Sequence, residues 1–226
     1  MEFLELLKTG RPVLLDGGMG TMLQARGLPV GAAPETATLE HPEWLREIHS
    51  AYLDAGSQIV YANTFGANRE KLAHCGRTVA EVVPAAVSVA REAARGRGLV
   101  ALDVGPIGQL LEPTGTLEFE QAVDIFAEVV EAGAAAGADL IAIETMTDLQ
   151  EARAALLAAR EHSSLPVLVT MTYEATGRTF LGCSPACAAL TLEGLGADAI
   201  GVNCSLGPRE MPPLVEELLR WTTLPI

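Results

Sequence analysis

Short apolar runs alternate along the chain with long alanine-rich segments. Most of the short runs are apolar throughout rather than at every second position, which is typical of parallel strands buried on both faces. We predict strands at Val13–Asp16, Gln58–Asn63, Leu99–Val104, Leu140–Glu144, Val167–Thr172 and Ala199–Asn203. The longer segments predict a short amphipathic helix within Met1–Gly10 and further helices at Glu43–Ala55, Thr78–Arg95, Leu117–Ala136, Asp148–His162, Pro185–Leu195 and Pro208–Trp221.

A short internal repeat supports this alternation. The chain reads Asp54-Ala-Gly-Ser-Gln-Ile-Val60, then Ala136-Gly-Ala-Asp-Leu-Ile141, then Leu195-Gly-Ala-Asp-Ala-Ile200. In each copy a helix ends near a glycine, which readily adopts the positive φ of a helix C-cap, and a strand follows at once. Repeated βα units over this length indicate either a (β/α)8 barrel or an open doubly wound sheet.

Polar residues at the ends of the predicted strands favour the barrel. Gly17-Gly-Met-Gly20 does not follow the G-x-G-x-x-G spacing of a dinucleotide-binding turn. Strand carboxyl ends converge on the face of a barrel that holds its active site. The polar strand ends are Asp16, Asn63, Asp103, Glu144, Thr172 and Asn203.

We therefore predict an α/β fold of the (β/α)8 TIM-barrel type. The predicted strands give six βα units, and Leu224–Ile226 resembles the start of a seventh strand. Because a complete barrel typically needs about 250 residues, we expect one domain over residues 1–226 that is truncated and incomplete at its C-terminal end.

Charge and composition exclude several classes of function. The formal charge is −14, and such a surface repels nucleic acid and anionic membranes. No apolar run reaches the length of a membrane span, and the first residues lack the features of a signal peptide. Four cysteines are too few for a disulfide scaffold. We expect a cytoplasmic protein with free thiols.

Three strand-end motifs carry candidate chemistry. Asp16 beside a glycine turn suits the amine and carboxylate of an amino acid, although a capping Asp in a tight turn explains it equally well. Glu144 ends a buried strand, so it needs either an ion-pair partner or a ligand. Cys204 precedes a predicted helix and is a candidate nucleophile or metal ligand, with a structural cysteine as the alternative. Cys183 and Cys187 would form at most half a metal site.

Taken together, these motifs resemble those of the homocysteine S-methyltransferase family. The similarity covers nearly the whole chain and is closest to the N-terminal homocysteine-binding module of cobalamin-dependent methionine synthases. The motifs that carry it are Asp16-Gly-Gly-Met-Gly-Thr21, Asn63-Thr-Phe-Gly-Ala-Asn68, Glu144-Thr-Met-Thr-Asp148 and Gly201-Val-Asn-Cys-Ser-Leu-Gly-Pro208.

The resemblance implies zinc-dependent transfer of a methyl group to the thiol of homocysteine, giving methionine. It implies that Asp16 and Glu144 hold the amine, that the turn at Gly17 meets the carboxylate and that Thr64 lies near the same pocket. Cys204 matches one of the three cysteines that hold Zn2+ in the family. The other two are an adjacent pair that this sequence lacks, so the zinc site is incomplete. No residue is assigned as catalytic.

The methyl donor and the partners follow from the same resemblance. Methylcobalamin on a separate module or corrinoid protein is the expected donor, and the 226-residue chain alone is expected to be inactive.

One alternative is a cobalamin-independent homocysteine methyltransferase that uses a methyl-onium donor. Another is a non-catalytic binding or assembly subunit, completed by another chain or by a dimer through its open sheet edges. A barrel lyase or aldolase is disfavoured, because Lys8 and Lys71 lie at no predicted strand end.

Overall fold

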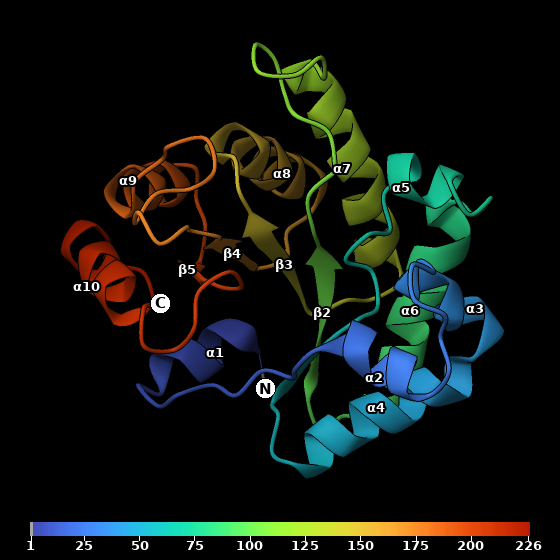
Figure 1. The fold of residues 1–226 in the computed structure, drawn as a ribbon. Coiled ribbons are helices and arrows are strands. Elements are labelled where there is room, and N and C mark those ends of the chain that lie inside the picture. Colours follow the sequence, from blue (N-terminus) through green and yellow to red (C-terminus); the bar gives the residue numbers. More distant parts are fainter. Residues whose placement is uncertain (1) are drawn as a thin grey trace.

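Parallel strands in sequence order form the centre of the molecule. The computed structural model describes residues 2–226, and its single sheet has five strands in the order β1-β2-β3-β4-β5 (Figure 1). Neighbouring strands are parallel throughout, as βα units require. The strands are β1 (Ile59–Tyr61), β2 (Leu99–Val104), β3 (Leu140–Met146), β4 (Val167–Met171) and β5 (Ala199–Val202).

Helices surround this sheet, and Figure 1 shows α6 to α10 following one another around its outer side. The arrangement is the α/β, TIM-barrel type. No helix within residues 2–226 has the length and apolar character to cross a membrane. The helices are α1 (Phe3–Lys8), α2 (Met19–Ala25), η1 (Pro34–Thr36), α3 (Ala37–Glu40), α4 (Pro42–Asp54), α5 (Arg69–Ala73), α6 (Val79–Ala94), α7 (Phe119–Ala135), α8 (Leu149–His162), α9 (Pro185–Gly194) and α10 (Pro212–Trp221).

The two faces of the sheet bury different sets of side chains. On β2, Val100 and Leu102 belong to the large core between the sheet and the outer helices. Ala101, between them, belongs to a smaller cluster that includes Phe3 of α1. Successive side chains on a strand point to opposite faces, so Asp103 faces the same interior as Ala101. The period of the strand therefore directs a carboxyl group into the interior of the sheet.

Two copies of the internal repeat contain Gly-Ala-Asp, at residues 137–139 and 196–198, and the acid has a structural role in both. Asp139 accepts a hydrogen bond from the Val100 amide at 2.8 Å, and Asp198 accepts one from the Val167 amide at 2.8 Å. Each acid directly precedes one strand and accepts from an amide near the start of the preceding strand in the sheet: Asp139 links β3 to β2, and Asp198 links β5 to β4. Asp198 also pairs with Arg160 at 2.6 Å. The repeated acid fixes the entry of successive strands into the sheet.

The structure confirms five of the predicted strands and corrects the first. The segment Val13–Asp16 is not a strand, because only Leu15 forms a bridge, to Ile59. Leu224–Ile226, the predicted start of a seventh strand, is not a strand either. It lies beside β5, where the Ile200 amide donates to the Pro225 carbonyl at 3.1 Å.

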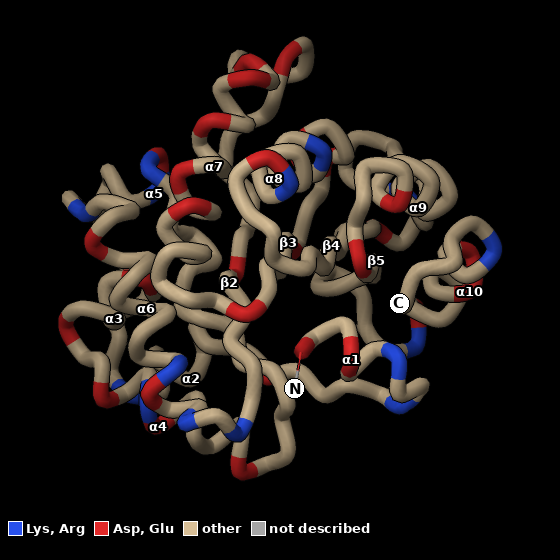
Figure 2. Tube along the Cα trace, turned by 180° about the vertical axis from the view of Figure 1, so that it is seen from behind, with Lys and Arg blue, Asp and Glu red and all other residues tan. Residues whose placement is uncertain are grey.

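The helices agree with the predictions within a few residues, with two kinds of exception. The last helix begins at Pro212 rather than Pro208. Four short elements were not predicted: α2, η1, α3 and α5. The predicted N-terminal helix is α1, and Met1 lies outside the described residues. Figure 2 shows Asp and Glu spread over the helices, consistent with the net charge of −14.

Candidate functional site

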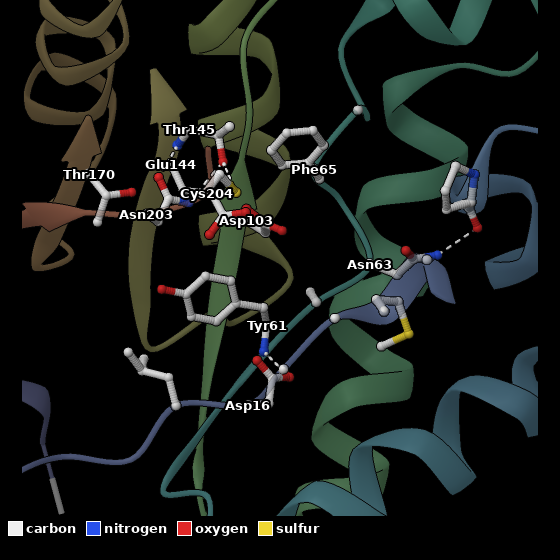
Figure 3. A pocket seen from close by; sticks show the side chains of 18 of the residues that line it. Asp16, Tyr61, Asn63, Phe65, Asp103, Glu144, Thr145, Thr170, Asn203 and Cys204 are labelled. Carbon is white, nitrogen blue, oxygen red and sulfur yellow. Dashed lines mark hydrogen bonds between the residues drawn. The ribbon is translucent and has the colours of Figure 1, made fainter. Parts of the chain in front are cut away.

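A cavity of about 1150 Å³ opens at the carboxyl ends of the strands. This is the position at which TIM-barrel proteins hold their active sites. Of the six polar strand ends expected from the sequence, all but Thr172 line this cavity, and Tyr61 lines it as well (Figure 3). The polar side chains that line it from the strands and the segments after them include Asp16, Tyr61, Asn63, Asp103, Glu144, Thr145, Thr170, Asn203 and Cys204.

Asp16 is held at the edge of β1. Its amide donates to the Ile59 carbonyl at 3.0 Å, and the Tyr61 amide donates to its Oδ2 at 2.9 Å. Burial raises the pKa of Asp16 to about 7, opposed by the Tyr61 hydrogen bond and reinforced by Glu144. The backbone therefore fixes a carboxyl group in a position where its charged form lacks sufficient solvation.

Asp103 is the most enclosed acid of the site. It is 8% exposed, and its Oδ1 has no hydrogen-bond partner. Burial raises its pKa well above the usual range, and the negative charges of Glu144 and Asp16 add to that shift. The sequence identified Asp103 as a polar strand end but gave it no ligand. An unpartnered buried carboxyl facing a cavity is a candidate ligand group.

Glu144 faces the cavity by the ordinary alternation of β3, and an irregularity in the strand follows directly after it. The register between β3 and β4 shifts between Ile143 and Met146, and Thr145 has a positive φ of 63°. Such bulges redirect side chains beside functional sites. Burial raises the pKa of Glu144. The sequence pattern predicted Glu144 at a strand end but carried no signal for the bulge.

Gly17 allows close packing of the turn after Asp16. A Cβ atom at Gly17 would lie 2.9 Å from the hydroxyl oxygen of Tyr52. That hydroxyl donates to the Gly18 carbonyl at 3.1 Å and so holds the turn. Gly17 lines the cavity together with the first residues of α2.

Thr64 does not line the cavity. It is 1% exposed, and its hydroxyl donates to the Asp103 carbonyl at 2.8 Å. The same hydroxyl oxygen accepts from the Asp103 amide at 3.0 Å. The side chain expected near the ligand instead fixes the backbone of the acid that faces the ligand space.

Cys204 lies at the mouth of the cavity, in the loop that follows β5. It is exposed and has a φ of 54°. Its Sγ is 3.7 Å from the Thr145 Oγ1. Asn203 holds this corner, since its Nδ2 donates to Thr145 Oγ1 at 2.8 Å and its Oδ1 accepts from the Thr145 amide at 3.2 Å. The thiol is therefore placed beside the residue that follows Glu144.

The cavity is electrostatically suited to a cation. Asp16, Asp103 and Glu144 take part in none of the ion pairs found within residues 2–226. Lys71 also lines the cavity, and burial lowers its pKa. A bound ammonium would supply the positive charge that these acids lack.

No metal centre is complete in the part of the chain that the structure describes. No three side chains of the His, Cys, Asp and Glu types converge there as metal ligands. Cys204 at the cavity mouth therefore belongs to no group of three such side chains among residues 2–226.

The fold and the site define an α/β protein of TIM-barrel type with an acid-lined cavity at the carboxyl ends of its strands. The chain belongs to the homocysteine S-methyltransferase family, whose profile matches residues 13–226.

Individual relatives agree with this assignment. The methionine synthase of Mycobacterium tuberculosis is 32% identical over 235 residues, which cover 96% of this chain and 20% of that protein. Betaine–homocysteine S-methyltransferase 1 of Sus scrofa is 34% identical over 214 residues, 91% of this chain and 75% of that protein. The chain thus spans about a fifth of the length of the mycobacterial methionine synthases that it matches.

A solved structure supports the same fold. The metallated form of the homocysteine methyltransferase MmuM from Escherichia coli superposes with a TM-score of 0.85 at 26% identity. The match covers 98% of this chain and 84% of that chain.

Proposed function

We propose that this chain binds homocysteine in the cavity at the strand ends and presents its thiol for methylation to methionine, as the homocysteine-binding module of a methionine synthase. The observation that carries the proposal is the set of three inward-facing acids, Asp16, Asp103 and Glu144, at the cavity whose mouth holds the Cys204 thiol. The family membership of residues 13–226 supports the choice of amino acid.

The acids bind the substrate ammonium in this proposal. Asp16 and Glu144 are the primary partners, and Asp103 supplies a carboxyl oxygen that has no other hydrogen-bond partner. A charge-assisted hydrogen bond of this kind contributes about 1.5–3 kcal/mol. Thr64 acts indirectly, by holding the backbone of Asp103 through two hydrogen bonds.

The turn at Gly17 receives the substrate carboxylate. Gly17 and Gly18 both line the cavity, and backbone amides in such a turn suit an anion. With the two charged groups bound at Asp16 and Gly17, the thiol end of the substrate extends toward Cys204.

Zinc is expected from the family, and the described residues fit it only in part. Cys204 would contribute one thiolate ligand, and the described residues hold no group of three candidate ligands that would complete the site. When bound, zinc lowers the pKa of a coordinated thiol and keeps its sulfur nucleophilic.

The methyl donor approaches from the open mouth of the cavity. Methylcobalamin carried by a separate corrinoid module is the proposed donor, supported by the similarity to the mycobacterial methionine synthases. A methyl-onium donor is the alternative, supported by the similarity to the betaine-dependent enzymes.

Titration calorimetry with L-homocysteine at pH 8 tests the binding proposal. Glu144→Gln should weaken binding roughly 10- to 100-fold, because one charged partner of the ammonium is lost. Asp124→Asn, an exposed acid on α7, is the matched control and should bind like the unchanged protein. Equal affinity for Glu144→Gln and the control would contradict the proposal.

The incomplete zinc site predicts poor turnover by the isolated chain. With zinc and either methylcobalamin or a methyl-onium donor, the chain alone should form negligible methionine. Zinc retained after dialysis should be low and should fall further in Cys204→Ser. Robust methionine formation by the 226-residue chain, or zinc content unaffected by Cys204→Ser, would show that this assignment is wrong.

A further inference from the structure

Two cysteines outside the cavity meet at the start of α9. Cys183 comes directly before the N-cap residue Ser184, and Cys187 lies in the first turn of the helix. Both thiols are free. Cys183 packs against the main core, whereas Cys187 is exposed. The pair thus combines one sheltered and one accessible sulfur.

Both cysteines contact the cap residue of the helix. The Cys187 amide donates to the Ser184 hydroxyl at 3.3 Å, and the Cys183 thiol donates to the Ser184 carbonyl at 3.3 Å. A side chain at the third helical position turns back toward the N-cap. The two cysteines, four residues apart, thus lie on either side of the same cap residue, Ser184.

A buried phenol completes the cluster. Tyr173 is 2% exposed, and its hydroxyl has no hydrogen-bond partner. It lies close enough to Cys183 and Cys187 for both to raise its pKa, in addition to the larger effect of burial. An unpartnered O–H group beside two sulfurs is a ready donor to a negatively charged sulfur or to an oxygen carried on it.

We propose that Cys183 and Cys187 form a peroxide-sensitive dithiol that closes reversibly into a disulfide. The Cys187 thiolate attacks one oxygen of hydrogen peroxide, the O–O bond breaks, and the departing hydroxide takes up a proton as water. The product at Cys187 is a sulfenic acid. Cys183 then gives up its proton as its sulfur attacks the sulfenic sulfur, the S–S bond forms, the S–O bond breaks, and the leaving hydroxide takes up that proton as a second water. The two thiols together lose two electrons and two protons.

The positions of the two sulfurs set their order of reaction. Cys187 is the exposed one and lies in the first turn of the ten-residue helix α9, so peroxide reaches its sulfur first. Cys183 is shielded and stays protonated, because burial and the neighbouring Cys187 raise its pKa to about 12. Cys187 is therefore the peroxide-reactive thiol and Cys183 the resolving one.

Peptide mapping of the reduced full-length chain after treatment with hydrogen peroxide tests this proposal. Cleavage after Arg178 and Glu193 releases Cys183 and Cys187 in one peptide, apart from Cys204. We expect that peptide to lose two hydrogens and to regain them with dithiothreitol, while Cys75 remains open to alkylation. In Cys183→Ser, Cys187 should accumulate as a sulfenic acid that dimedone traps. Cys75→Ser is the matched control and should form the same disulfide.

Three results would overturn the proposal. Cys187 could oxidise to a sulfinic acid while Cys183 stays alkylatable in the unchanged protein. A disulfide could instead join either cysteine to Cys204 or to a second chain. Both thiols could also remain fully reduced at peroxide concentrations that oxidise Cys204.

Discussion

At the scale of single residues, the buried carboxylate of Asp16 destabilises the folded protein when it is charged. Its pKa in the folded protein is about 7, above its ordinary value of 3.8. The stabilising contribution of this group is therefore complete below about pH 4 and is lost as the pH rises through 7. Asp16→Asn removes the buried charge and should raise stability at pH 8 by on the order of 1 kcal/mol, or about 2–4 °C.

Thermal unfolding at pH 5 and pH 8 measures this effect. Asp16→Asn should gain stability at pH 8 and much less at pH 5, where the wild-type carboxyl already holds its proton. Asp124→Asn controls for the loss of one surface charge. A gain of the same size at both pH values would show that burial of the Asp16 charge is not the cause.

His49 gives the opposite dependence on pH. It is fully buried on α4, and neither ring nitrogen has a hydrogen-bond partner. Burial lowers its pKa from 6.5 to about 4. Stability from His49 is present above pH 6.5 and is lost as the pH falls toward 4, because the unfolded chain takes up the proton first.

Replacement of His49 by leucine should remove that acid sensitivity. Between pH 6.5 and 5, His49→Leu should lose about 1–2 kcal/mol less unfolding free energy than the wild type. Urea titrations at the two pH values give the comparison, with the exposed His74 changed to Gln as the control. Parallel losses in His49→Leu and in the wild type would contradict this account.

At the scale of elements, the close contact of α7 with β2 depends on Gly133. A Cβ atom there would lie 2.5 Å from both terminal carbons of Leu102, a contact too short to accommodate. Gly133→Ala should therefore cost about 1–3 kcal/mol of stability through overpacking. Urea unfolding midpoints measure the loss.

The last residue of α9 offers the matched control. A Cβ atom at Gly194 would meet nothing within 4 Å, and the residue is exposed. Gly194→Ala should be neutral or stabilising by up to about 1 kcal/mol, because alanine favours helix more than glycine does. If both variants lost stability equally, the close α7–β2 contact would not be the cause.

Elements with strong local signals were predictable from the sequence. β2 lies at its predicted bounds because a run that is apolar except for Asp103 follows a glycine, and Asp148 caps α8 by accepting from the Gln150 amide at 2.9 Å. The segment Val13–Asp16 has a similar apolar pattern but does not form a strand. Its Leu14 amide is bound by the Gln58 side chain at 3.2 Å rather than by a neighbouring strand. Which partner a strand finds is a tertiary property.

The sequence predicted which strand ends form the site, but not where every side chain near it points. The period of the strands places Asp103 and Glu144 on the inner face, as the pattern indicates. It does not reveal that Thr64 turns to the backbone of Asp103, 39 residues away in the sequence. The positive φ angles of Thr145, within β3, and of Cys204, in the loop after β5, likewise have no local signal in the sequence.

At the scale of the whole molecule, the chain covers very different shares of the proteins that it resembles. The chain covers 84% of the Escherichia coli methyltransferase chain but about a fifth of the mycobacterial methionine synthases. The fold and the acidic pocket lie within residues 2–226, whereas a complete zinc site does not. The described residues themselves form the acidic pocket, so the binding proposed for it can be tested on this chain alone.

The central claim is that the ammonium of homocysteine lies on the acids of the cavity. A double cycle tests it, with wild type and Asp16→Asn each titrated at pH 8 with L-homocysteine and with 4-mercaptobutanoate, which lacks the amino group. Removing the amino group should weaken binding to the wild type roughly 10- to 100-fold. The same removal should cost Asp16→Asn much less, because the partner is already gone. An equal loss in both proteins would contradict the claim that Asp16 binds the ammonium.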